Sequence, residues 1–156
     1  MEYVVVCKIL IPVPSFLKKD FFESLNIQMG KNFETKVLPE ISEHVSEKSL
    51  IMKMRYVKGY ANDSENLGEI GTPTLFTPDD WARMLYAGIV LQEKNNFLKI
   101  DSTNLSYLKL KDGEVLAVYV LFNPDGSIWR CGANPIDDRR REDEGRCLLS
   151  LDNSFI

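Results

Sequence analysis

The chain has 156 residues, of which 44% are hydrophobic and 27% are charged, and its formal net charge is −4 at pH 7. This composition excludes an intrinsically disordered chain, because it supplies enough apolar surface for a core. The acidic balance disfavours nucleic acid and anionic membranes as general partners. The length predicts a single globular domain over residues 1–156.

The three cysteines, Cys7, Cys131 and Cys147, lie far apart and lack the close spacing of metal-binding or redox motifs. An odd number of cysteines without a pairing motif favours free thiols and a reducing, cytoplasmic location. The only histidine, His44, has no paired cysteine motif beside it. We therefore expect no metal site and no cofactor.

The first predicted element is a strand from Tyr3 to Ile11, which is apolar on both faces apart from Lys8. Such a run is typical of a central strand covered on two sides. It lacks a basic leader and is too short to cross a bilayer, so we interpret it as a buried strand and not as a targeting or membrane segment. Pro12 and Pro14 end the strand because proline cannot donate to a β-ladder.

Two helices are predicted in the next part of the chain. Within residues 15–29, apolar residues recur every four positions at Leu17, Phe21 and Leu25, and Gly30 stops the helix. After it, Pro39 is suited to the first position of a second, short helix. The inner face of that helix would carry Ile41 and Val45.

The segment after residue 48 changes from a strand pattern to an irregular one. Apolar residues from Leu50 to Tyr56 alternate with Lys53 and Arg55, which indicates a half-buried strand. Residues 60–76 show no clean period, and a long connection inside a compact domain is usually functional or mobile. We therefore predict a contact loop here. Its acidic residues are candidates for binding another protein: Asp63, Glu65 and Glu69.

The strongest helix signal begins at Thr77. Thr77 is a suitable N-cap, Pro78 suits the first helical position, and two aspartates follow in the first turn. Apolar side chains cover most of the circumference from Trp81 to Leu91, so the helix should be interior and should be the main cover of the sheet. Gly88 would allow another backbone to approach closely.

Residues 105–131 predict a C-terminal β-meander of three strands and two turns. Asp112-Gly113 is typical of a two-residue type I′ turn, which would place Leu110 opposite Val115. The second turn spans residues 123–126, where Pro124 presets φ and Gly126 takes the left-handed position. That turn would place Tyr119 near Arg130.

This register sorts the meander side chains into two faces. The expected core face collects Leu108, Leu110, Val115, Ala117, Tyr119, Leu121 and Ile128. The other face is charged near the first turn, at Lys109, Lys111 and Glu114, and apolar toward the second, at Val118, Val120, Phe122 and Trp129. Such an apolar end must be covered by a helix of the same chain, by another protein or by a second copy. Phe122 and Trp129 are therefore candidate binding residues.

Charged residues dominate the segment from Asp137 to Arg146. In a helix its charges would pair internally, with Asp137 reaching Arg141 and Arg139 reaching Asp143. This favours a solvated segment, with a binding patch as the alternative. A final short strand is expected from Cys147 to Leu151. Five cations on predicted strands would form one basic surface only if the strand order brings them together: Lys8, Lys53, Arg55, Lys109 and Lys111.

These elements predict an α+β fold with a mainly antiparallel sheet of about five or six strands, packed by two or three helices. The scarcity of catalytic motifs favours a small soluble protein that binds another protein, or a second copy of itself, as an inhibitor, immunity-type factor or adaptor. The alternative is a small enzyme or small-molecule binder with a pocket between sheet and helix. Its candidate polar groups are His44, Glu40, Arg130 and Tyr119.

Overall fold

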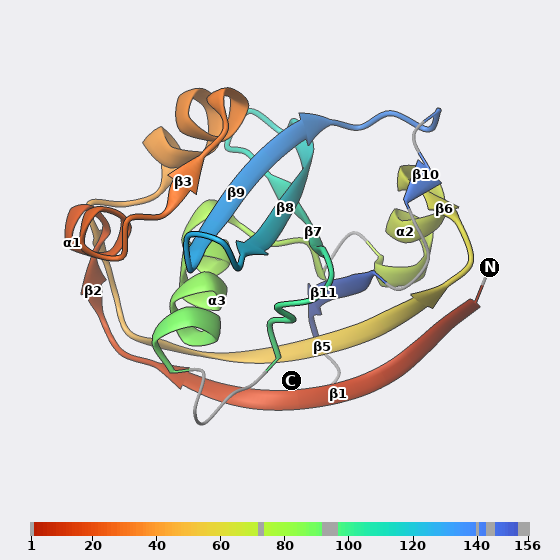
Figure 1. Ribbon diagram of the computed structural model, residues 1–156, viewed down its shortest axis with the longest axis horizontal. Coiled ribbons are helices and arrows are strands. Elements are labelled where there is room, and N and C mark those ends of the chain that lie inside the picture. Colours follow the sequence, from red (N-terminus) through yellow and green to blue (C-terminus); the bar gives the residue numbers. More distant parts are fainter. Residues whose placement is uncertain (1, 72–73, 92–96, 140, 143–145, 153–156) are drawn as a thin grey trace.

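The computed structural model describes residues 2–71, 74–91, 97–139, 141–142 and 146–152 (Figure 1). Its main sheet has seven strands in the order β1-β5-β11-β7-β8-β9-β3. Their bounds are Glu2–Val13 (β1), Gln28–Met29 (β3), Lys48–Lys58 (β5), Asn104–Lys109 (β7), Val115–Asn123 (β8), Ile128–Pro135 (β9) and Cys147–Leu151 (β11). Two small ribbons pair β2 (Phe16–Leu17) with β4 (His44–Val45), and β6 (Ala61–Asn62) with β10 (Arg141–Glu142).

The sheet is mixed. β11 runs parallel to β7 and β3 runs parallel to β9, whereas the other neighbours are antiparallel. The α+β class is thus confirmed, and the prediction of a mainly antiparallel sheet is correct only in part. The parallel contact arises because the late strand β11 inserts between β5 and β7, a pairing between distant segments that no local pattern encodes.

Helices cover both faces of this sheet. They are α1 (Lys18–Ser24), α2 (Asp63–Ile70) and α3 (Pro78–Val90), with a π-helical turn at Phe33–Val37 and a 3-10 turn at Leu38–Glu40. In Figure 1, α1 and β3 lie at one end of the sheet, and α2, β6 and β10 at the other.

The predicted helix at Thr77 is confirmed as α3, with Thr77 accepting a hydrogen bond from the Asp80 N–H. The space beside Gly88 is filled by the side chains of Leu98 and Phe97, so side chains and not a backbone approach this glycine.

Two cores result, one on each face. The large core joins α1, α3 and the β-strands, and includes Trp81, Leu108, Leu116, Val118 and Val120. The small core lies under α2 and contains Val57, Ala61, Ile70, Leu105, Tyr107, Ala117 and Leu148. Successive residues of β8 alternate between the two cores, as side chains of a strand must. We call these surfaces of the sheet the large-core face and the small-core face.

β1 is an edge strand and not the central strand that its sequence predicts. It pairs only with β5 among the described strands. One side of β1 contributes to the large core, through Ile11 and Val13. By contrast, Val5, Val6 and Leu10 are 53%, 55% and 64% exposed. A run of apolar residues identifies a strand but does not reveal whether both of its edges and faces are covered.

The first turn of the meander differs from its prediction by one residue. Leu110 donates its N–H to the Glu114 carbonyl at 2.8 Å, and Gly113 has φ +96°, so the loop contains three residues and not two. Leu108 therefore lies opposite Leu116, not Ala117. A one-residue slip moves side chains to the other face. This is why Val118 and Val120 belong to the large core while Tyr107 and Ala117 belong to the small one.

The second turn is also longer than predicted. Asn123 pairs with Ile128, and the left-handed residue is Ser127 at φ +51° instead of Gly126. The Asp125 N–H donates to the Asn123 Oδ1 at 3.1 Å, which stabilises the start of the turn. This register differs by two residues from the expected one. Because side chains alternate with a period of two, the same residues of β8 and β9 still share a face, and Phe122 lies opposite Trp129.

The two early helices are shorter or displaced. Helix α1 ends at Ser24, and the positive φ of Asn26 (51°) turns the chain before Gly30. Residues 39–45 form only part of a 3-10 turn followed by β4. The inward residues of the second predicted helix were nevertheless correct, since Ile41 is 2% exposed and Val45 is fully buried. In the first predicted helix only Phe21 of the apolar repeat is buried, whereas Leu17 and Leu25 are 51% and 40% exposed.

The predicted contact loop contains helix α2. Asn62 accepts a hydrogen bond from the Glu65 N–H at 2.9 Å, and the Glu65 carboxylate accepts one from the Asn62 N–H at 3.1 Å. This reciprocal capping box begins the helix. An Asn three residues before a Glu is a sequence signal for the start of a helix. It was missed because residues 60–76 lack a regular hydrophobic period.

The charged segment near the end of the chain is not a helix where it is described. Arg139 pairs with Asp137 at 3.1 Å, and Arg141 and Glu142 form the short strand β10. The expected partner Asp143 lies outside the described residues, as do the neighbouring Arg140 and Glu144. The predicted final strand at Cys147–Leu151 is confirmed as β11.

Candidate functional site

The outer edge of β1 presents the clearest apolar surface among the described residues. Val5, Val6 and Leu10 are each more than half exposed along this one strand. A shallow cavity of about 350 Å³ lies beside them, lined by Lys8, Ile9, Leu10 and Ile51. In Figure 1, β1 follows the outer margin of the molecule. An edge strand of this length offers backbone hydrogen-bonding groups together with apolar side chains.

Positive charge accompanies this edge. The β1–β5 pair carries one carboxylate residue, Glu2, and five cationic residues: Lys8, Lys48, Lys53, Arg55 and Lys58. This is the reverse of the whole chain, whose net charge is −4. Lys8 lies directly opposite Lys53 in the ladder. Of the five cations predicted on strands, Lys8, Lys53 and Arg55 are thus brought together, whereas Lys109 and Lys111 are not.

Three of these cations have carboxylate partners. The Lys8 Nζ lies 2.9 Å from the Asp152 Oδ2, and the Lys48 Nζ lies 3.1 Å from the Asp80 Oδ1. The Arg55 Nε lies 3.2 Å from the Glu69 Oε2. Within the described part of the chain, Lys53 makes no ion pair. Of the two lysines that face each other in the β1–β5 ladder, Lys8 is thus the one paired with Asp152.

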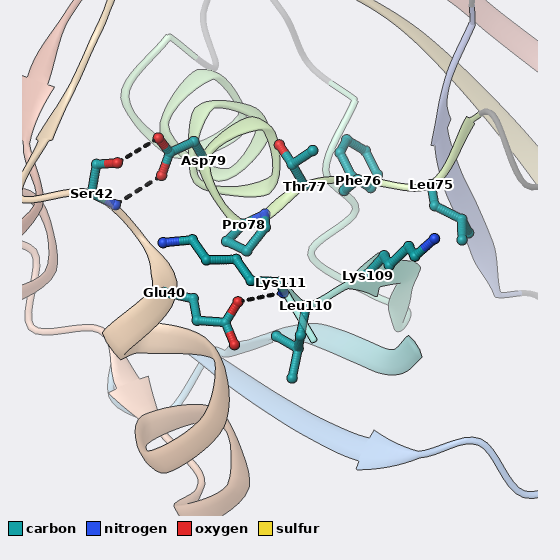
Figure 2. Close-up of a pocket in the computed structure, with 10 residues that line it drawn as sticks. All are labelled: Glu40, Ser42, Leu75, Phe76, Thr77, Pro78, Asp79, Lys109, Leu110 and Lys111. Atoms are coloured by element: carbon teal, nitrogen blue, oxygen red, sulfur yellow. Dashed lines mark hydrogen bonds between the residues drawn. The ribbon is translucent and has the colours of Figure 1, made fainter. Parts of the chain in front are cut away.

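A second cavity, of about 430 Å³, lies between the start of α3 and the β7–β8 turn (Figure 2). Leu75, Phe76, Pro78 and Leu110 provide its apolar lining, and its charged lining residues are Glu40, Asp79, Lys109 and Lys111. Glu40 accepts a hydrogen bond from the Lys111 N–H at 2.7 Å, and Asp79 accepts two from Ser42. The two acidic and two basic lining residues balance in charge, and both acids already accept hydrogen bonds within the protein. The cavity therefore favours neither an anionic nor a cationic ligand.

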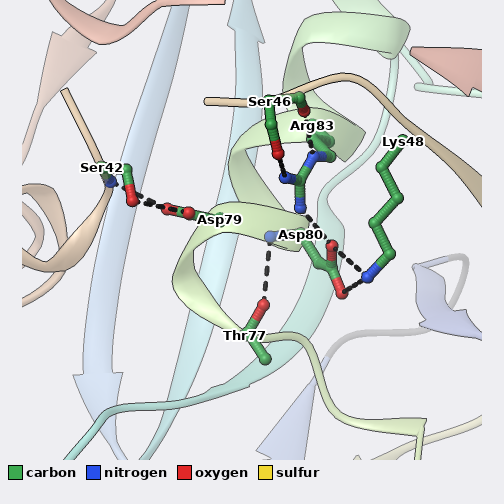
Figure 3. Close-up of polar contacts among 7 residues, drawn as sticks. All are labelled: Ser42, Ser46, Lys48, Thr77, Asp79, Asp80 and Arg83. Carbon is green, nitrogen blue, oxygen red and sulfur yellow. Dashed lines mark hydrogen bonds and ion pairs between the residues drawn. The ribbon is translucent and has the colours of Figure 1, made fainter. Parts of the chain in front are cut away.

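An ion cluster joins the buried Asp80 and Arg83 of α3 to the half-exposed Lys48 of β5 (Figure 3). Asp80 is 5% exposed and receives Arg83 at 2.6 Å and Lys48 at 3.1 Å. Arg83 also donates to the Ser46 carbonyl at 2.9 Å and the Ser46 hydroxyl at 3.0 Å. These contacts attach the segment before β5 to the first turn of α3. The cluster is internally satisfied and holds the fold together.

The acidic residues predicted to bind a partner have structural contacts. Asp63 is fully buried and accepts hydrogen bonds from the Tyr107 hydroxyl at 2.6 Å and the Asp137 N–H at 2.8 Å. Glu65 completes the capping box of α2, and Glu69 pairs with Arg55. The three residues share one helix, but their carboxylates do not form one exposed acidic surface.

The two predicted aromatic residues also turn inward or partly inward. Trp129 is 8% exposed and belongs to the large core, while Phe122 packs against that core from its margin. Their ring centroids are 5.1 Å apart. The apolar end of the meander is therefore covered mainly by the chain itself, which was the first of the explanations that the sequence left open.

The polar residues suggested for a pocket do not converge. Glu40 lines the cavity at α3, and His44 is exposed on β4. Tyr119 packs against the small core on the other face of the sheet, with the Arg146 guanidinium 5.7 Å from its ring centroid. Arg130 is exposed on β9. Sequence reasoning missed the β1 edge, although Lys8 was a usable signal: a charge inside an apolar strand is a common feature of edge strands.

The buried hydroxyls of Tyr3 and Tyr107, which contact α2, predict that the free energy of unfolding falls at alkaline pH. Burial, followed by the charges of Glu65 and Glu69, raises the pKa of Tyr3 from 10.0 to about 12. Burial and the hydrogen bond to Asp63 raise the pKa of Tyr107 further. Both phenols stay neutral in the folded chain at a pH where the unfolded chain ionises. Stability should therefore be intact below pH 10 and fall as the pH rises toward about 12.

Urea unfolding between pH 9 and pH 12 would test this expectation, because the range starts about one unit below the ordinary tyrosine pKa of 10.0 and reaches the raised value of about 12. Tyr3→Phe should flatten the alkaline decline relative to the wild type. Tyr60→Phe removes a tyrosine that is 59% exposed and serves as the control. An alkaline slope unchanged by Tyr3→Phe would contradict the assignment.

Comparison with known proteins gives no match to a family model, a curated protein or a solved structure. Within the described residues, none of the helices combines the length and the apolar character needed to cross a membrane. All three cysteines are free thiols.

Proposed function

We propose that the protein acts by binding another protein and that the exposed edge of β1 provides the main contact. The observation that supports this proposal is the row of exposed apolar side chains on an edge strand, at Val5, Val6 and Leu10. Strand addition to such an edge combines main-chain hydrogen bonds with side-chain contacts. An inhibitor or adaptor that binds in this way needs no catalytic residues. The free thiols favour a cytoplasmic setting for the protein.

The proposal predicts that removing two apolar side chains from the edge abolishes binding without unfolding the chain. Val5→Ser with Leu10→Ser removes contacts worth about 1.5 kcal/mol or more each when buried, so the partner's affinity should fall about 100-fold. Both side chains are more than half exposed, so the free energy of unfolding should change by less than about 1 kcal/mol.

Native mass spectrometry of the protein isolated at its endogenous level would test this prediction. The wild type should carry a discrete, stoichiometric protein-sized mass increment that the double variant loses. Leu17→Ser with Ile100→Ser is the matched control, because these residues are 51% and 63% exposed away from β1. An increment retained by the β1 variant would refute the proposed surface. A small-molecule increment in place of a protein would instead favour the cavity at α3.

A further inference from the structure

We propose that the cavity at α3 binds a small zwitterion, namely a free α-amino acid with an apolar side chain. This inference goes beyond the proposed protein-binding function and is independent of it, because the described residues that line the cavity all lie outside β1. It depends on the apolar lining of the cavity, on the charged groups that the protein leaves unpaired there, and on the balance of the charges.

The apolar lining comes from two segments that meet at the cavity. Leu75, Phe76 and Pro78 lead into α3, and Leu110 follows β7. Phe76 is fully buried, and its carbonyl accepts the Lys109 N–H at 2.9 Å, so this lining is attached to the sheet. A volume of about 430 Å³ is near the lower end of the range for small-molecule sites and suits a ligand the size of one amino acid.

Of the two acids in the cavity, Glu40 is the one with an unused carboxylate oxygen. Both carboxylate oxygens of Asp79 accept hydrogen bonds from Ser42, at 2.8 Å and 2.7 Å. Glu40 accepts the Lys111 N–H at 2.7 Å through Oε1 only. Among the described residues, its Oε2 has no hydrogen-bond or ion-pair partner. Glu40 can therefore receive the ammonium group of a ligand.

The two lysines of the cavity keep their ammonium groups available. Within the part of the chain that the structure describes, neither Lys109 nor Lys111 makes an ion pair or a side-chain hydrogen bond. In Figure 2 the Lys111 side chain extends toward Ser42 and the Lys109 side chain toward Leu75, so an ammonium group lies on each side of Pro78. Either group can bind the carboxylate of a ligand.

The balance of charge favours a ligand that carries both charges and is neutral overall. A simple anion would be attracted by the lysines but repelled by Glu40 and Asp79, and a simple cation would be repelled by the lysines. An uncharged ligand would displace water from these charged groups without pairing them, which is unfavourable. A zwitterion pairs its carboxylate with a lysine and its ammonium with Glu40.

The contact between Glu40 and Lys111 favours a compact zwitterion. The Glu40 carboxylate is bonded to the backbone of Lys111, whose side chain carries one of the two ammonium groups (Figure 2). A ligand with its carboxylate and ammonium on one carbon atom can therefore contact both residues together. Its apolar side chain would lie against Phe76, Pro78 and Leu110. These requirements describe a free α-amino acid.

Isothermal titration of the full chain with three related ligands tests the inference. L-Phenylalanine carries both charges, 3-phenylpropionate carries only the carboxylate, and 2-phenylethylamine carries only the ammonium. The wild type should bind phenylalanine about tenfold more tightly than either analogue, because each analogue leaves one kind of charged group in the cavity unpaired.

Variants that remove single charges should shift this preference in opposite directions. Glu40→Gln keeps an oxygen for the Lys111 N–H, so it should weaken phenylalanine about threefold to tenfold without weakening 3-phenylpropionate. Lys109→Gln with Lys111→Gln should weaken phenylalanine by a similar factor without weakening 2-phenylethylamine. Lys36→Gln is the control, because this lysine pairs with Glu114 and does not line the cavity, and it should leave all three affinities unchanged.

Several results would overturn the inference. Either analogue binding the wild type as tightly as phenylalanine would show that the cavity does not require both charges. Phenylalanine binding that is unchanged in both cavity variants would place the ligand elsewhere, and absence of phenylalanine binding at millimolar concentration would exclude the site. None of these results bears on β1, which native mass spectrometry of Val5→Ser with Leu10→Ser tests separately.

Discussion

Replacing Trp81 by alanine is expected to lower the free energy of unfolding by about 3–5 kcal/mol. Trp81 is fully buried on α3, and its ring centroid lies 5.1 Å from that of Phe33. Its indole N–H donates to the Ser106 hydroxyl of β7 at 3.0 Å. Truncation would therefore create a cavity between the helix and the sheet and would remove the indole donor that the Ser106 hydroxyl accepts.

Urea unfolding of purified variants would measure this loss. Trp81→Phe retains most of the apolar volume and removes the indole hydrogen bond, so its expected cost is smaller, about 1–3 kcal/mol. Trp129→Ala provides the comparison at the margin of the large core, where the side chain is 8% exposed. A loss below about 1 kcal/mol for Trp81→Ala would show that α3 does not pack on the sheet as described.

Replacing Asp63 by alanine is expected to cost about 2–5 kcal/mol, because it leaves buried hydrogen-bond donors without an acceptor. The Tyr107 hydroxyl and the Asp137 N–H both donate to this carboxylate. The same cluster continues through Asn66, which donates to the Tyr107 hydroxyl at 3.0 Å and accepts from the Tyr3 hydroxyl at 2.6 Å. Removing one member therefore disturbs contacts of α2 with both β1 and β7.

A double-mutant cycle would isolate the central contact. Asp63→Ala and Tyr107→Phe should show a coupling free energy of about 0.5–3 kcal/mol, since each removes the partner of the other. Ser64→Ala, at the neighbouring exposed residue, is the control: its hydroxyl donates to Asp138 at 2.7 Å on the surface. Strict additivity of the two buried substitutions would contradict a direct bond. This cluster also means that reversing the charge of Asp63 would test folding and not partner binding.

Elements whose signals are local could be predicted from the sequence. The cap at Thr77 and Pro78, the continuous apolar surface after it, and the alternation from Leu50 to Tyr56 identified α3 and β5. Turns were harder, because Asp112-Gly113 fits both a two-residue loop and a three-residue loop with glycine left-handed. That ambiguity of one residue reversed the assignment of Val118 and Val120, although both were correctly recognised as strand residues.

The candidate site depends on information that a single strand does not contain. Strand order decides whether β1 is central or at an edge, and this order is set by the distant insertion of β11. The pairing of Lys8 with Lys53 likewise follows from the register between two separate segments. By contrast, Trp129 is interior because other elements of the same chain pack against it, and the sequence left this open beside cover by another protein or by a second copy.

The place of β11 also has a consequence for biosynthesis. Within the described sheet, the β1–β5 pair and the β7–β8–β9 group are hydrogen-bonded to each other only through β11. A ribosome must therefore deliver residues up to Leu151 before the two halves can join across a continuous sheet. Contacts between segments so far apart in sequence also slow folding. Until then, β5 presents an unpaired inner edge, and β7 presents one at Asn104 and Leu105, whereas Phe76 pairs with β7 at Leu108. The nascent chain therefore passes through a stage in which chaperone protection would matter most.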